Sequence, residues 1–112
     1  AEMAAGAACG LSLFLGEVPL LPGARDFAEM GLVPEGAWRY REGRITAMVN
    51  ASEVPAVDLD ILFDPQTSGG LLCAVRTEAA GEALGALRAA GVEAAIVGET
   101  GGRPGELRVV LG

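Results

Sequence analysis

The chain has 112 residues, of which 51% are apolar and 21% charged, the usual size of one globular domain with a buried core. Gly, Glu or Pro interrupts every apolar run well before the roughly 20 residues that a membrane-spanning helix needs. We therefore expect a soluble protein with no membrane partner. The net charge of -7 repels polyanions, so we also expect no nucleic-acid partner.

The cysteines, Cys9 and Cys73, lie far apart in apolar surroundings, and the sequence contains no histidine. Without a C-x-x-C spacing or a histidine, we expect no metal site and no Cys-His nucleophile. Unpaired cysteines that resemble small core residues fit a reducing, cytoplasmic location. No cationic segment precedes an apolar stretch at the start, which argues against a secretory signal, and Ala1 in place of Met indicates processing or truncation.

The first predicted elements are a helix, a strand and a second helix. Ala1 to Ala8 is rich in alanine and favours a helix, which Gly10 ends, and Leu11 to Leu15 favours a strand. Prolines interrupt the next apolar run, and a short helix is expected from Ala24 to Met30, with Gly31 closing it.

The middle of the chain has weaker signals. Leu32 to Ala56 contains Pro and Gly with little sustained period, so we expect an irregular connection with one short helical or strand piece. Its length makes it a candidate functional segment. A short helix from Val57 to Phe63 should follow, ended by Asp64-Pro65, and then a strand from Leu71 to Val75.

The last third gives the clearest periodicity. Small and apolar residues recur at helical spacing from Thr77 to Ala90, which predicts a helix that ends at Gly91. Glu93 to Gly98 and Leu107 to Leu111 favour strands, joined by a glycine-rich hairpin loop. This order predicts an α+β fold: a mixed β-sheet with helices packed on it, partly ferredoxin-like.

The densest polar segment lies between the Val57 to Phe63 helix and the next predicted strand. Its candidate site residues are Asp64, Gln66, Thr67, Ser68, Gly69 and Gly70. Two glycines let backbone amides converge on one point, and the hydroxyl groups could donate to an anion, so a phosphate-facing loop is plausible. Alternatively, the segment only ends a helix, caps loose backbone groups and enters a strand. It is not a Walker-type loop, which opens a helix and needs a Lys.

Other charged groups are weaker candidates. The one basic and aromatic cluster consists of Trp38, Arg39, Tyr40, Arg41 and Arg44. Arg39 and Arg41 suit bidentate phosphate contacts, although the same pattern fits an amphipathic surface segment. Asp58 and Asp60 could bind a hard cation only with further oxygen ligands, and otherwise they form a solvated helix start.

Asp64 to Leu72 reads D-P-Q-T-S-G-G-L-L, which resembles the signature of selenophosphate synthetases, also called selenide, water dikinases. Three further segments resemble the family in the same order: Pro19 to Ala24, Gly31 to Gly36, and Ile96 to Glu99. The resemblance covers nearly the whole chain and implies the superfamily that includes aminoimidazole ribonucleotide synthetase. It identifies residues 1–112 as a single C-terminal domain, without the N-terminal ATP-binding domain.

The resemblance implies that the full-length protein makes selenophosphate, AMP and phosphate from ATP, selenide and water with Mg²⁺, for selenocysteine and selenouridine synthesis. It also implies a homodimer whose missing N-terminal domain is the partner of this one. The family's reactive cysteine or selenocysteine, its lysine and its metal-binding aspartates have no counterpart here. We therefore transfer no catalytic residue, and we expect this chain alone to be inactive and to hold no cofactor.

By the same resemblance, the Asp64 to Gly70 loop lies near the domain interface and helps to enclose phosphates, with Thr67 and Gly69 as first choices. The chain departs from the family at Ala37, where Thr is more usual, and at Tyr40, where Asn is more usual, so a ligand contact from that segment is in doubt. Two alternatives stay open: a free-standing protein-interaction module, and a domain of a sister ATP-dependent kinase or synthetase.

Overall fold

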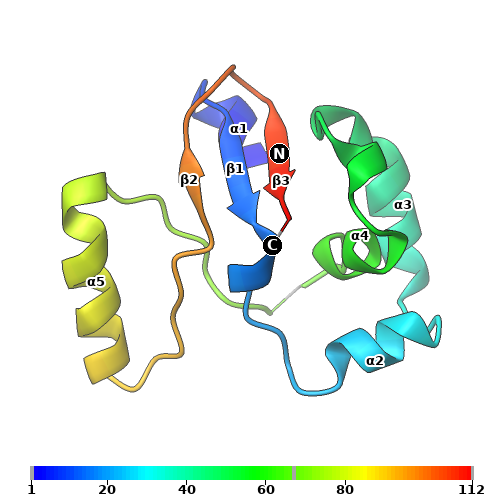
Figure 1. Cartoon of the computed structure of the whole chain (residues 1–112), viewed down its shortest axis with the longest axis horizontal. Helices are drawn as coiled ribbons and strands as arrows, with labels where there is room; N and C mark the ends of the chain where they lie inside the picture. Colours follow the sequence, from blue (N-terminus) through cyan, green and yellow to red (C-terminus); the bar gives the residue numbers. More distant parts are fainter. Residues whose placement is uncertain (1, 67, 112) are drawn as a thin grey trace.

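The structure is a computed structural model that describes residues 2–66 and 68–111. Its strands are β1 (Leu11–Phe14), β2 (Gly98–Thr100) and β3 (Leu107–Val110). Its α-helices are α1 (Glu2–Gly6), α2 (Ala24–Glu29), α3 (Glu35–Arg44), α4 (Ala56–Leu62) and α5 (Thr77–Ala89). Helices α2, α3 and α4 lie on the β3 side of the sheet, whereas α5 lies on the β2 side (Figure 1). The predicted α+β class, with a mixed sheet and helices, is confirmed.

Strand β1 is the centre of the sheet that the described residues form, in the order β2-β1-β3. It pairs antiparallel with β2, where Leu13 lies opposite Gly98, and parallel with β3, where Leu13 lies opposite Val109. A side chain at Gly98 would collide with the backbone carbonyl of Ser12. Glycine is therefore required where β2 approaches β1.

The outer edge of β3 is covered by the segment that follows α3. Met48 forms an isolated parallel bridge to Leu107, and the Val49 amide donates to the Leu107 carbonyl oxygen at 2.9 Å. Next to it, the Asn50 side chain donates from Nδ2 to the Val109 carbonyl oxygen at 2.7 Å and accepts from the Val109 amide at 3.0 Å. One buried amide side chain thus replaces a neighbouring strand at this position.

The hydrophobic core lies between the sheet and α4. Its buried side chains are Met48, Val54, Leu59 and Val109, and the half-buried side chains packed against them are Leu15, Ile45, Ala51, Leu62, Phe63 and Leu107. Most come from α4 and from residues 45–54, which include the short 3₁₀ helices η2 (Ile45–Ala47) and η3 (Ala51–Glu53). The core therefore fixes α4, whose last residues precede the polar loop.

Two ion pairs join the helices on this side. Arg25 of α2 binds Asp58 of α4 at 2.5 Å, and Arg41 of α3 binds Asp60 of α4 at 2.8 Å. Asp58 is only 5% exposed, so its charge depends on Arg25 for compensation. These pairs hold α2 and α3 against the two acidic positions of α4.

Several sequence-based expectations were wrong. The helical piece expected within Leu32 to Ala56 is present, but it is longer than expected: it is the ten-residue helix α3, which has Glu35 in its first turn and Arg41 and Arg44 in its last turn. These charges complement the helix dipole and compensate for weak apolar periodicity. The hairpin is also wrong: β2 and β3 lie on opposite edges of β1 and cannot pair with each other.

The predicted strand from Leu71 to Val75 is absent from the described residues: these five residues are exposed and belong to no strand. Cys73 is consequently exposed and not part of the core, whereas Cys9 is half-buried. Residues 93–97 are likewise outside any strand, and β2 starts only at Gly98. In contrast, the helices predicted near Ala24, Val57 and Thr77 are confirmed, with ends that differ by one or two residues.

Candidate functional site

The polar loop begins at the C-terminal end of α4. The Phe63 amide closes the helix through the Leu59 carbonyl oxygen at 3.0 Å, and the Asp64 amide donates to the Ile61 carbonyl oxygen at 3.2 Å. Pro65 has no amide hydrogen to continue this pattern, so the chain leaves the helix here. The loop is therefore attached directly to the helix that the core and the two ion pairs fix.

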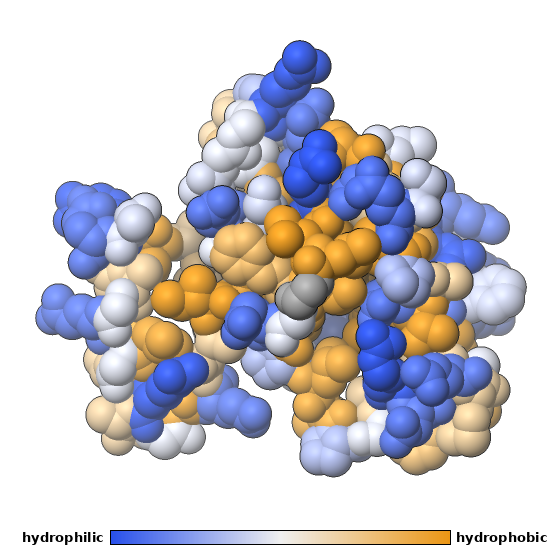
Figure 2. All heavy atoms as spheres, viewed as in Figure 1, coloured by the Kyte–Doolittle hydropathy of each residue, from blue (hydrophilic) through white to orange (hydrophobic). Residues whose placement is uncertain are grey.

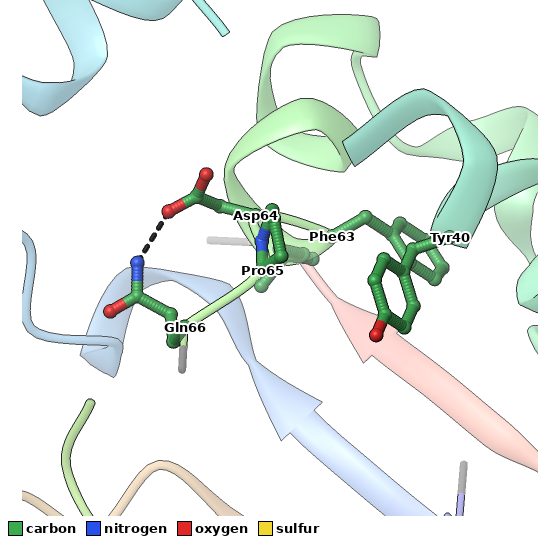
Figure 3. A pocket seen from close by; sticks show the side chains of 6 residues that line it. Tyr40, Phe63, Asp64, Pro65 and Gln66 are labelled. Carbon is green, nitrogen blue, oxygen red and sulfur yellow. Dashed lines mark hydrogen bonds between the residues drawn. The ribbon is translucent and has the colours of Figure 1, made fainter. Parts of the chain in front are cut away.

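Asp64 and Gln66 face each other across Pro65. The Gln66 side-chain amide donates a hydrogen bond to Asp64 Oδ2. Figure 3 shows this pair on one side of Pro65 and the rings of Phe63 and Tyr40 on the other side. The loop thus has a polar side and an aromatic side.

An open pocket of about 410 Å³ lies against this loop (Figure 3). It is lined by Tyr40, Leu62, Phe63, Asp64, Pro65 and Gln66. Tyr40 comes from α3, and the other residues come from the end of α4 and the loop. The pocket offers an apolar wall with one carboxylate and one amide group at its rim, which suits a ligand that a second body covers.

Gly69 and Gly70 differ in their surroundings. A Cβ atom at Gly69 would lie 2.8 Å from Cβ of Gln66, whereas a Cβ atom at Gly70 would meet nothing within 4 Å. Gly69 therefore lets the backbone pass close to Gln66. Ser68, Gly69 and Gly70 are all exposed, so their amides are accessible to an anion. Thr67 lies outside the described residues.

The structure does not bring Arg39 and Arg41 to the pocket wall. Arg39 is 80% exposed and pairs at 3.1 Å with Glu35, one turn away on α3. Arg41 is engaged by Asp60 and also lies over the Trp38 ring at 5.9 Å. Arg41 therefore joins two helices, and a phosphate group would have to compete with Asp60 for its guanidinium group.

Sequence reasoning did not name three residues that line the pocket as site candidates: Tyr40, Leu62 and Phe63. Tyr40 is the one of these that comes from a different element, α3. Its ring lines the pocket beside the loop and also an adjoining groove of about 360 Å³, which reaches Leu11 and Leu13 of β1. Arg44 lies 5.8 Å from the Tyr40 ring and pairs with Glu2 at 2.5 Å. The available signal was that Tyr40 is an aromatic residue within the basic cluster, but only the packing of α3 on α4 shows that it meets the loop.

Comparisons with known proteins assign the chain to a family. Residues 1–110 match the family model described as AIR synthase related protein, C-terminal domain. The chain belongs to this family.

Curated relatives of this chain are selenide, water dikinases, which confirms the resemblance seen in the sequence. The chain is 43% identical over 111 residues, 98% of its length, to the selenide, water dikinase of Pelobacter propionicus. It is 42% identical over 97 residues, 87% of its length, to that of Geobacter metallireducens, and 42% identical over 84 residues, 72% of its length, to that of Caldanaerobacter subterraneus. It spans only 32%, 28% and 23% of these relatives, respectively.

Proposed function

We propose that this chain is the C-terminal domain of a selenide, water dikinase, and that an ATP-binding domain precedes it in the full-length protein. The 43% identity over 98% of the chain carries this proposal. The full-length enzyme would make selenophosphate, AMP and phosphate from ATP, selenide and water. Since the chain spans about a third of its curated relatives, the other two thirds would supply the reactive and nucleotide-binding groups.

In this proposal, the Asp64 to Gly70 loop closes one side of the ligand site. The exposed amides from Ser68 to Gly70 would donate to phosphate oxygens, while the Gln66 amide group holds the Asp64 carboxylate aside. Tyr40, Phe63 and Pro65 would form the apolar wall that excludes water once the N-terminal domain covers the pocket. The roles of Thr67 and Gly69 rest on the sequence resemblance.

The residues described do not by themselves fit a Mg²⁺ site. Asp58 and Asp60 are each engaged by an arginine, and no group of three potential metal-ligating side chains occurs within residues 2–66 and 68–111. We therefore assign no reaction step to the ion from this chain. ATP and Mg²⁺ would bind with the N-terminal domain, in a cytoplasmic homodimer, and this domain alone would be inactive.

An exposed apolar surface supports the need for a covering partner. Leu21, Phe27, Met30 and Leu32, on and around α2, are 82%, 53%, 63% and 65% exposed. The same surface would suit the alternative of a free-standing protein-interaction module. A sister ATP-dependent kinase or synthetase is less favoured, because the relatives cited above are selenide, water dikinases.

The test is calorimetric titration of ATP with Mg²⁺ into this chain and, in parallel, into the full-length protein, followed by an assay of selenide-dependent AMP formation. We expect binding and AMP formation with the full-length protein only. Binding to the isolated chain would contradict the proposed division of the site between two domains. Full-length protein that binds ATP but forms no AMP with selenide would favour the sister-enzyme alternative.

A further inference from the structure

The Tyr40 ring forms a wall of the pocket but is not buried in it. It lines the pocket together with Leu62 and Phe63 at the end of α4, and 50% of the residue is exposed. A side chain this exposed on the surface of a helix can change rotamer unless neighbouring groups hold it. The position of this wall therefore depends on the groups that contact Tyr40.

The groove that adjoins the pocket has a polar boundary made of three residues. Glu2, Tyr40 and Arg44 line it, and its other lining residues are methionine, leucine and phenylalanine. Figure 2 shows apolar atoms gathered over the middle of the molecule and hydrophilic atoms mainly toward the outside. The side chains of Glu2 and Arg44 are 77% and 41% exposed. The three polar residues therefore lie where an apolar surface meets water.

Arg44 contacts the Tyr40 ring from the same helix. The two residues are four positions apart on α3, so their side chains lie on the same face. The guanidinium carbon of Arg44 lies 5.8 Å from the centre of the Tyr40 ring, within the range of a cation–π interaction. Figure 3 shows the same ring beside Phe63, which packs against the core. A cation and a side chain that the core fixes thus both adjoin the ring.

Glu2 holds the cation in its place. Arg44 Nη1 lies 2.5 Å from Glu2 Oε1, so the pair joins α3 to α1. Because both side chains are partly or largely exposed, water screens the pair and it adds little to the stability of the fold. The pair restricts the rotation of the guanidinium group, and this restriction extends to the ring that the group contacts.

Arg39 offers a comparison on the same helix. It pairs with Glu35 at 3.1 Å, and the two side chains are 80% and 85% exposed. Arg39 lines neither the pocket nor the adjoining groove. Replacing it removes an exposed ion pair and one positive charge from α3 but leaves the wall of the pocket intact.

We propose that Arg44, tethered by Glu2, is a positioning residue that holds the Tyr40 ring in place as the wall that keeps water out of the pocket. The inference rests on the proposed function, because the excluded water would compete with selenide for the phosphoryl group. In this side reaction, a water oxygen bonds to the transferred phosphorus, the bond from that phosphorus to the nucleotide breaks, and phosphate forms in place of selenophosphate. Exclusion of water from a site prevents such reactions.

ATP consumption by the full-length protein tests this role. The readout is the ratio of the rate without selenide to the rate with selenide. Since one cation–π contact changes a population by about fivefold, Arg44→Met should raise this ratio by about fivefold. Arg44→Lys keeps a cation beside Glu2 and the ring, so it should stay close to the wild type, and Arg39→Met should leave the ratio unchanged. A melting curve reports whether each variant is folded. An unchanged ratio in folded Arg44→Met would overturn the proposal.

A double variant tests whether Arg44 acts through Tyr40. Tyr40→Ala alone should raise the ratio, because it removes the wall. Adding Arg44→Met to Tyr40→Ala should then have no further effect, since no ring remains to be positioned. If Arg44→Met raises the ratio equally with and without the Tyr40 side chain, Arg44 acts on the ligand directly and the proposal is wrong.

Nuclear magnetic resonance of this chain gives a readout that needs no selenide. The sequence contains one tyrosine, so the ring signals of Tyr40 are identified directly. Arg44→Met should weaken the contact signal between the Tyr40 and Phe63 rings, and Arg39→Met should not. A full-length protein that is inactive with selenide would overturn the proposed function and the role of the wall with it. An active protein in which Arg44→Met changes neither the ring signals nor the ratio would overturn the positioning role alone.

Discussion

At the scale of single residues, a few individual residues satisfy needs that their neighbours in the sequence do not meet. Asn50 caps the edge of β3, Arg25 compensates a buried carboxylate, and Gly69 lets the loop backbone pass close to Gln66. The roles of Asn50 and Arg25 could not be predicted from local sequence, because their partners lie 59 and 33 residues away. The sequence nevertheless identified the loop, since its hydroxyl, amide and glycine residues are contiguous.

Asn50→Ala should strongly destabilise the domain. The change removes both hydrogen bonds to the Val109 backbone and leaves a buried amide and carbonyl group unpaired, which costs about 2–4 kcal/mol in total. Urea denaturation measures this loss of unfolding free energy. The exposed neighbour Ser52 provides the control, since Ser52→Ala should change it by less than about 0.5 kcal/mol. Equal stabilities of the two variants would show that the Asn50 contacts do not contribute.

Two arginine variants should differ in cost because their carboxylate partners differ in burial. Arg25→Met leaves the buried Asp58 without its partner and should destabilise the domain by about 3 kcal/mol. Arg39→Met removes only an exposed pair with Glu35 and should cost less than about 0.5 kcal/mol. Thermal and urea unfolding of both variants check this difference. A small cost for Arg25→Met would mean that Asp58 reaches water when unpaired.

The two loop glycines should respond differently to alanine in the full-length enzyme. Gly69→Ala forces a Cβ atom against Gln66 and shifts the loop, so turnover should fall by about 10- to 100-fold if the loop faces the ligand. Gly70→Ala introduces a Cβ atom into open space and should have much less effect. Steady-state kinetics with a melting curve separates activity from stability. Normal turnover for both variants would support the purely structural interpretation of the loop.

At the scale of elements, local signals located four helices well, but for α3 they gave only an unplaced short helical or strand piece. The helix α5 was predictable from its apolar spacing and from Gly91, which has φ +80° just after the helix. Helix α3 has little apolar periodicity, and it is held by charges at its ends and by the Arg41–Asp60 pair. The pairing of the strands was the least predictable feature. Strands β2 and β3 follow each other in the sequence, but β1 lies between them in the sheet.

Gly85→Ala should stabilise α5 locally. Gly85 lies inside the helix with open space around it, and alanine is favoured over glycine there by about 1 kcal/mol. Exchange of the α5 amides should therefore slow by about fivefold. Gly91→Ala is the opposite control, because a positive φ disfavours alanine, and exchange should accelerate. Faster exchange in Gly85→Ala would indicate that this side of α5 is covered and has no room for a methyl group.

At the scale of the whole molecule, the apolar composition exceeds what the core encloses. Leu21 and Leu32 near α2 stay exposed, and so do Leu71 and Leu87. The chain matches only about a third of its curated relatives, and in the larger protein proposed above these open surfaces would be available to the remaining domain. In the described residues, no helix is long and apolar enough to cross a membrane.

Leu32→Ser should distinguish a surface covered by another domain from one that stays in water. In this chain, the substitution should change the unfolding free energy by less than about 0.5 kcal/mol, since Leu32 is 65% exposed. In the full-length protein, it should destabilise the interface by about 1–2 kcal/mol. Urea denaturation of both forms makes the comparison, with Glu29→Ser as a control on α2. Identical small effects in both forms would place the interface elsewhere.

The sequence by itself determined the α+β class, most helices, the family and the position of the polar loop, because each depends on residues that are close together along the chain. The tertiary structure decided the rest: the strand order around β1, the Asn50 cap, the meeting of Tyr40 with the loop, and the engagement of Arg41 by Asp60. These four features depend on which distant segments of the chain pack against each other and bury their surfaces. Local propensity contains no information about that choice, because the same strand or charge can be satisfied by several partners.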